Sequence, residues 1–156
     1  MPKRTSRQAS RKAGQATPAQ PAKRVHALSF PGADTSDERP CWRFTHVDHD
    51  GPWGFGEVEP AVLRDILRHL GQFESMKLNE IFHSGGYPGK DYDVPGIPNA
   101  EALERIIDMK LTDQTKIWAL RLGGRPRLYG FLWRNIFNVV WWVPEHDIHP
   151  SHLKHT

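Results

Sequence analysis

Apolar residues recur along the chain with two different periods, and the helical period comes first. In residues 60–70 they fall three or four positions apart, which predicts one face of an α-helix that begins at a proline and ends at Gly71. Residues 73–82 continue this spacing and predict a second, shorter helix. A third stripe predicts a helix over residues 100–110, with Asn99 as its N-cap.

The strand period of two dominates the C-terminal part. An alternating, aromatic stretch at residues 41–47 predicts a strand at a sheet edge, and three more runs predict strands at residues 116–122, 127–133 and 136–143. Short connections with turns at Gly123-Gly124 and Arg134-Asn135 separate these last three, so they must form an antiparallel meander. Residues 84–98 are rich in Gly and Pro and predict an irregular surface loop. The expected fold is therefore α+β, with N-terminal helices packed on one face of an antiparallel sheet that ends in a three-strand meander.

The two ends of the chain have a different composition. Residues 1–24 contain seven basic residues, no acid and no Leu, Ile, Val, Phe, Trp or Tyr, so they have nothing to bury. A solvated tail, a nucleic-acid-binding arm and a targeting signal remain open for them. We predict a disordered basic tail and linker over residues 1–40, a single domain over residues 41–150, and a flexible, His-bearing C-terminus over residues 151–156.

Charge and cysteine content narrow the class of protein. The chain has 21 Lys+Arg and 18 Asp+Glu, and without residues 1–24 the balance becomes 14 basic against 18 acidic residues. The basic character therefore belongs to the tail. No apolar run approaches the roughly 20 residues of a membrane span. The single cysteine, Cys41, excludes an intramolecular disulfide and favours a reducing compartment. We expect a cytoplasmic protein without a membrane partner.

Positive charge returns within the predicted meander. Residues 114–144 hold five basic residues and no acid, together with seven of the sixteen aromatic residues. Arginine pairs bidentately with phosphate, and aromatic rings stack on unpaired bases, so this pattern favours single-stranded RNA or DNA. Alternation places Arg127 and Tyr129 on the same strand face. The candidate contacts are Lys116, Trp118, Arg121, Arg125, Arg127, Tyr129 and Arg134. Aromatic residues that fill the core and arginines at a solvated rim are the structural alternative.

Histidines supply the remaining candidate chemistry. His146 follows the last strand between Glu145 and Asp147, and nearby carboxylates raise the pKa of a histidine and orient its ring, as a general acid requires. An ordinary surface histidine is the alternative. His46, Asp48 and Asp50 alternate and could form a metal trio, but an Asp-Gly-Pro turn explains the last of them. We predict no metal site.

The segment KIWALRLGGRPRLYGFLWRNIFNVVWWVPEHDIHPS, with its PRLYG motif, resembles the C-terminal half of the RelE/ParE-like toxin superfamily, especially the RelE and YoeB ribonucleases. The resemblance covers residues 99–150. It implies a metal-independent ribonuclease that cleaves mRNA, often at the ribosome, needs no cofactor, and is neutralised by a cognate antitoxin protein. Carried over, Arg127 matches the phosphate-contacting arginine, Arg121 the basic position on the preceding strand, and His146 the residue that protonates the leaving group. Lys116 matches a basic residue before that strand.

The expected function is therefore that of a RelE-like endoribonuclease toxin with Arg121, Arg127, His146 and Tyr129 as catalytic residues. The alternative is a non-catalytic nucleic-acid-binding or protein-interaction module that uses the same basic, aromatic sheet face.

Overall fold

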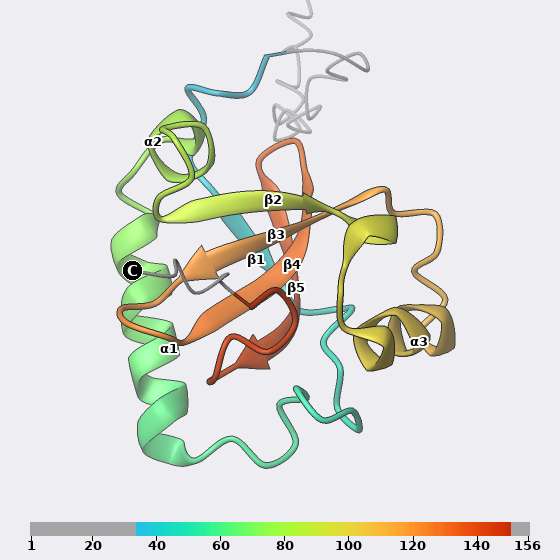
Figure 1. Ribbon diagram of the computed structural model, residues 1–156. Helices are drawn as coiled ribbons and strands as arrows, with labels where there is room; N and C mark the ends of the chain where they lie inside the picture. The colour runs from blue at the N-terminus through green and yellow to red at the C-terminus, as the bar shows by residue number, and fades with distance from the viewer. Residues whose placement is uncertain (1–33, 151–156) are drawn as a thin grey trace, which may run out of the picture. The chain divides into compact units, whose positions relative to one another are not determined.

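The computed structural model describes residues 34–150, and a five-stranded mixed sheet runs through them (Figure 1). The sheet order is β1-β5-β4-β3-β2, with β1 parallel to β5 and all other neighbours antiparallel. The strands are β1 (Cys41–Arg43), β2 (Gly89–Asp93), β3 (Lys116–Arg121), β4 (Arg127–Trp133) and β5 (Ile136–Val143). The α+β class, the edge position of β1 and the β3-β4-β5 meander are confirmed, whereas the prediction of an antiparallel sheet is wrong for β1, which runs parallel to β5. The predicted basic tail at residues 1–24 and the C-terminus at residues 151–156 lie outside the described residues.

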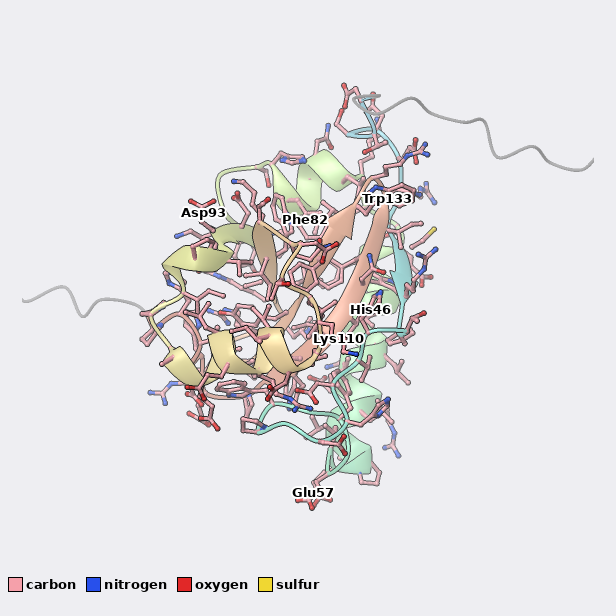
Figure 2. The ribbon with its side chains drawn as sticks, turned by 90° about the vertical axis from the view of Figure 1, so that its right-hand side faces the viewer. His46, Glu57, Phe82, Asp93, Lys110 and Trp133 are labelled. Atoms are coloured by element: carbon pink, nitrogen blue, oxygen red, sulfur yellow. The ribbon has the colours of Figure 1, made fainter. Side chains whose placement is uncertain are left out.

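Helices cover both faces of the sheet, which corrects the prediction of N-terminal helices on one face. They are α1 (Pro60–Phe73), α2 (Leu78–Phe82) and α3 (Ala100–Asp108), and α3 follows β2 in the chain. Apolar side chains of α1 and α2 pack in one core with Leu120, Leu128 and Phe137. Side chains of α3 pack in a second core with Tyr129 and Trp141. In Figure 2, α3 lies in front of the strands and α1 behind them.

The alternation predicted for β4 is confirmed by these two cores. Tyr129 and Phe131 belong to the core under α3, whereas Leu128 and Leu132 belong to the core under α1 and α2. The register to β5 shifts between Tyr129, which faces Trp141, and Gly130, which faces Val139. One residue of β5 is thereby left over, as in a β-bulge. Most meander aromatics are buried, as the structural alternative expected, and Trp133 is the exception.

The prediction of an irregular loop at residues 84–98 is wrong, because β2 and a 3-10 turn at Val94–Gly96 lie within it. Pro88 and Pro95 stand outside the strand, and all five β2 residues pair with β3. Gly89 opens the strand because α2 crosses it closely: a Cβ there would lie 2.8 Å from the carbonyl oxygen of Ile81. Proline and glycine thus delimit a short edge strand here.

The helix boundaries differ in smaller ways. Helix α1 continues past Gly71 to Phe73, whose ring is buried against Trp42 at a centroid distance of 6.5 Å. Helix α2 is only five residues long. Asn99 caps α3 as predicted, since its side chain accepts a hydrogen bond from the backbone N–H of Ala102 at 3.1 Å. Within residues 34–150 no helix is both long enough and apolar enough to cross a membrane.

Candidate functional site

The hairpin between β3 and β4 gathers the candidate residues at one end of the sheet. Arg121, the last residue of β3, pairs directly with Arg127, the first residue of β4, and Arg127 pairs on its other side with Val143, the last residue of β5. The chain that leaves β5 therefore reaches His146 beside both arginines. Tyr92 on β2 pairs with Ile117, near the start of β3, so its side chain is on the same face, and its electrostatic interaction with Arg121 and Arg127 connects it to this group. We call this set the hairpin-end cluster: Tyr87, Tyr92, Arg121, Arg127, Tyr129, His146 and His149.

Arg127 is fixed by the turn that precedes it. Only 7% of the residue is exposed, and its Nη1 donates to the carbonyl oxygens of Gly124 at 2.6 Å, Arg125 at 2.9 Å and Pro126 at 3.0 Å. Gly124 adopts a φ of 59°, and this sharp turn brings the three carbonyl oxygens to the same guanidinium nitrogen. Burial and the neighbouring Arg121 lower the pKa of Arg127, while nearby tyrosines oppose them. The guanidinium remains a cation, as arginine does in proteins, and its position is set before any ligand arrives.

Tyr129 lies beneath this cation and is fully buried. Its hydroxyl has no hydrogen-bond partner among residues 34–150. Burial raises the pKa of Tyr129, and Tyr92 adds to the effect while Arg127 opposes it. The phenol is therefore neutral and able to donate. Buried polar atoms without a partner are uncommon, and each one marks a place where a further polar group could be satisfied.

His146 lies in the left-handed backbone region, with a φ of 63°. Burial lowers its pKa, and the charges of Arg127, Arg121 and His149 lower it further, against an opposing effect of Asp147. The expectation that flanking carboxylates would raise this pKa is wrong. Glu145 instead pairs with Arg125, with 3.1 Å between its Oε2 and the arginine Nη1. At neutral pH the imidazole is therefore mostly uncharged and suited to accept a proton.

Aromatic and cation–π contacts connect Tyr92, His149, Arg121 and Tyr87 within the cluster. The ring of Tyr92 stacks on His149 with centroids 3.8 Å apart, and Lys90 lies over the same tyrosine ring at 5.1 Å. The guanidinium of Arg121 lies 5.5 Å from the ring centre of Tyr87. Burial raises the pKa of Tyr92 although Arg121 and Arg127 oppose it. The strand period of residues 89–93 could have identified Tyr92 from the sequence.

Three predicted RNA contacts lie elsewhere. Lys116 starts β3 at the opposite end and pairs with Asp91, its Nζ 2.5 Å from Oδ2. Trp118 points to the other sheet face, where its ring meets Phe82 at 5.1 Å. Arg134 lies in the turn between β4 and β5, over the ring of Trp133 at 5.7 Å. Arg125 is near the cluster in the chain, but Glu145 neutralises its charge.

Of His46, Asp48 and Asp50, Asp48 anchors the fold. The three residues lie beyond β1, and residues 34–150 contain no group of three His, Cys, Asp or Glu placed to hold a metal. Asp48 accepts hydrogen bonds from Nε and Nη2 of Arg105 at 2.7 and 2.6 Å and from Nε1 of Trp141 at 3.0 Å. Burial alone would raise its pKa, but these bonds outweigh burial and hold the pKa well below its usual range.

Comparison with known proteins adds no assignment, since the chain matches no family model, no curated protein and no solved structure. The class that can be stated is an α+β domain with a cationic cluster of arginine, tyrosine and histidine at one sheet end. Function must be argued from that cluster.

Proposed function

We propose that this protein is a metal-independent endoribonuclease of the RelE-like toxin type, acting on mRNA and held in check by an antitoxin protein. One observation carries the proposal: at the hairpin end, two arginines and a neutral histidine meet a buried phenol that has no hydrogen-bond partner within residues 34–150. Cations fixed in advance stabilise the charge that a phosphodiester gains in its transition state. A neutral imidazole beside them can remove the proton of the ribose 2′-hydroxyl, which makes the 2′-oxygen a nucleophile.

The reaction that fits these groups is transesterification within the RNA strand. The ribose 2′-oxygen attacks phosphorus while its proton passes to His146, the bond to the 5′-oxygen breaks, and the products are a 2′,3′-cyclic phosphate and a 5′-hydroxyl end. Arg121, which is exposed, contacts the phosphate oxygens. Tyr92 keeps its proton at neutral pH and can donate it to the departing oxygen, after which the proton held by His146 passes through solvent back to Tyr92 and restores both groups.

This assignment changes the roles of two residues. His146 acts as the base, whereas the sequence pattern suggested the acid, because its surroundings disfavour the protonated form. Tyr129 is fully buried and acts on the cluster through its electrostatic interaction with Arg127, where the sequence suggested a catalytic residue. Arg127 serves both the fold and the site. Its Nη1 holds the turn, and its positive charge acts on the cluster.

A cleavage assay tests the proposal. A labelled single-stranded RNA is incubated with the full chain in the presence of EDTA, with and without ribosomes. Wild type should leave cyclic phosphate ends, while Arg121→Ala and His146→Ala should leave the RNA intact. Arg64→Ala is the matched control, because Arg64 is an exposed cation on α1, away from the cluster. Expression of wild type should arrest growth and the two site variants should not.

The non-catalytic alternative has an observation of its own. Nη1 of Arg127 is committed to backbone carbonyls and Tyr129 is out of reach, so few side chains can touch a scissile phosphate. If wild type leaves RNA uncut in every arm but retains it in a gel shift that Arg121→Ala weakens, the protein is a binding module.

A further inference from the structure

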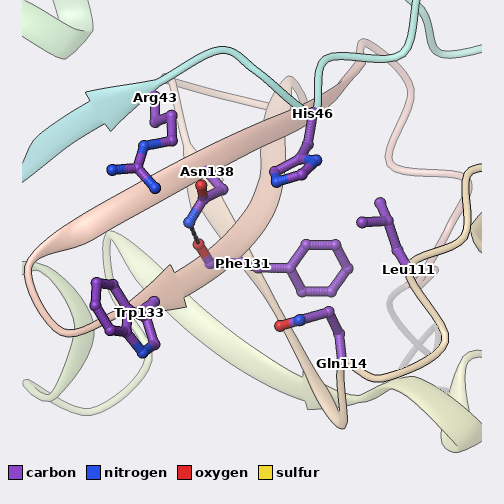
Figure 3. A pocket seen from close by; sticks show the side chains of 7 residues that line it. All are labelled: Arg43, His46, Leu111, Gln114, Phe131, Trp133 and Asn138. Carbon is purple, nitrogen blue, oxygen red and sulfur yellow. Dashed lines mark hydrogen bonds between the residues drawn. The ribbon is translucent and has the colours of Figure 1, made fainter.

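A second polar pocket lies on the same sheet face as the hairpin-end cluster, at the other end of β4. Its volume is about 200 Å³. Figure 3 shows the seven side chains that line it, which come from β1, β4, β5 and two loops: Arg43, His46, Leu111, Gln114, Phe131, Trp133 and Asn138. None of them is acidic, although the chain outside its first 24 residues carries more acid than base. The pocket is therefore locally positive on an acidic domain.

The floor of this pocket contains a polar residue where the core would accept an apolar one. Asn138 is 8% exposed, and its Nδ2 donates to the carbonyl oxygen of Phe131 at 3.2 Å. That bond fixes the orientation of the amide. Figure 3 shows the amide oxygen turned away from the carbonyl, and within residues 34–150 it accepts no hydrogen bond. The oxygen thus presents an unused acceptor to the pocket.

The rim combines a flat ring with positive charge. Trp133 is 60% exposed, which is unusual for a tryptophan in this domain. Arg43 has no acidic partner within 4 Å among residues 34–150, and His46 faces the pocket from the loop after β1. An exposed indole stacks on a planar ring, and an unpaired guanidinium binds an anion bidentately.

We propose that this pocket binds one nucleotide unit, with the base beside Trp133 and Phe131, a base N–H donated to the oxygen of Asn138, and the phosphate at Arg43. The chemistry of the lining selects this ligand class because every base offers an aromatic face and a donor edge next to a phosphate. The volume is below the range of about 300–1,000 Å³ usual for drug-sized ligands and suits a single ring system. The source is either a free mononucleotide or one residue of an RNA strand.

The pocket and the cluster cannot share one nucleotide. Trp133 lies six positions after Arg127 along β4, which corresponds to about 20 Å at strand spacing. The core under α3 lies between them on this face. Nucleotide binding at the pocket is therefore independent of the cleavage reaction. Only an RNA strand long enough to reach both sites would connect the two.

Binding of the four 5′-mononucleotides to the full chain tests the proposal. The indole N–H resonance of Trp133, assigned by its absence in Trp133→Phe, should shift on titration. Trp133→Ala and Arg43→Ala should each weaken binding about tenfold, within the range reported for one stacked base. Phe44→Ala is the control, because Phe44 is also half-exposed and adjacent to Arg43 but does not line the pocket. Wild-type affinity in both pocket variants, or the absence of any shift, overturns the proposal.

Two further probes identify the source and exclude a simple anion site. A trinucleotide with 2′-O-methyl groups, which cannot be cleaved, should bind more than tenfold tighter than a mononucleotide if the pocket holds part of a strand, and equally if it holds a free nucleotide. Inorganic phosphate that binds as well as a nucleotide, and is unaffected by Trp133→Ala, contradicts the proposal. His146→Ala should keep nucleotide binding, so failure of the pocket and failure of the ribonuclease remain separate results.

Discussion

The two ends of β4 carry positive charge in opposite ways. At the first residue, Arg127 is nearly buried and tied to three carbonyl oxygens of its own turn. At the last residue, Trp133 stands mostly exposed beside Arg43, a cation without an acidic partner in the described part of the chain. The first arrangement fixes charge before a ligand binds, as catalysis requires, whereas the second must order its side chains on binding. The difference assigns chemistry to one end and binding to the other.

The largest effect should come from loss of the fixed cation. Arg127→Ala should abolish RNA cleavage and also lower the free energy of unfolding by about 2–4 kcal/mol, because three turn carbonyls lose a charged donor. Arg121→Ala should lower cleavage with little loss of stability, since Arg121 is exposed. Urea unfolding and single-turnover cleavage measure the two quantities. Equal stability of both variants would show that the turn does not depend on Arg127.

His146 should show the next largest effect. His146→Ala should lower the cleavage rate by roughly 10²- to 10⁴-fold, the usual contribution of a positioned acid or base. As a base it works in the neutral form, so the wild-type rate should rise with pH, with the midpoint of the rise below about 6.5, the ordinary histidine value, and then level off. Removal of Asp147, which opposes the lowering of this pKa, should move that rise to lower pH. A rate that falls across the same range would restore the acid role.

A third substitution acts on the pocket end. Asp48 anchors the loop that carries His46, through Arg105 and Trp141. Asp48→Asn should reduce stability at pH 7 by about 2–3 kcal/mol, somewhat below the usual cost of breaking a buried pair because Arg105 is partly exposed. The folded-state pKa of Asp48 lies below its unfolded value, so this stability is present above about pH 4 and lost as pH falls further.

Thermal melts of both proteins between pH 2 and pH 7 check this prediction. The difference between wild type and Asp48→Asn should shrink towards low pH, and nucleotide binding at the pocket should weaken in the variant while the hairpin end stays intact. A constant difference would mean that the ion pair does not titrate with folding.

The contrast also shows what the sequence could predict. Periodicity identified α1, α3 and the meander because each has a long, regular apolar face. It missed β2 because a five-residue edge strand between Pro88 and Pro95 is too short for its alternation to outweigh the surrounding Gly and Pro. It also could not predict that α3 covers the second sheet face, since this depends on the crossover between β2 and β3.

The residues of the candidate site also differ in how far the sequence could predict their positions. Arg121 and Arg127, which the sequence singled out by charge and resemblance, lie side by side because the ends of neighbouring strands meet at the hairpin. Lys116 and Trp118 lie away from the cluster, which the sequence could not predict because the charge and aromatic count of a strand does not say which end or face each side chain occupies. The missed Tyr92 comes from the unrecognised strand. The pocket was missed because residues as distant as Arg43 and Asn138 meet there only through the pairing of β1 with β5.

The smallest expected effect is on Tyr129, and it separates support from stability. Its buried hydroxyl has no partner in residues 34–150, and an unsatisfied buried donor destabilises a fold. Tyr129→Phe keeps the ring and removes only that atom, so the free energy of unfolding should stay the same or rise by up to about 1 kcal/mol. Cleavage should nevertheless fall about tenfold if the phenol acts on the charge of Arg127. A matched Tyr92→Phe variant should lose more activity, because Tyr92 is half-buried at the surface. If Tyr129→Phe is both less stable and fully active, the hydroxyl stabilises the fold and does not contribute to catalysis. Among residues 34–150, Arg127 would then be the only buried group at the hairpin end that is positioned for the reaction.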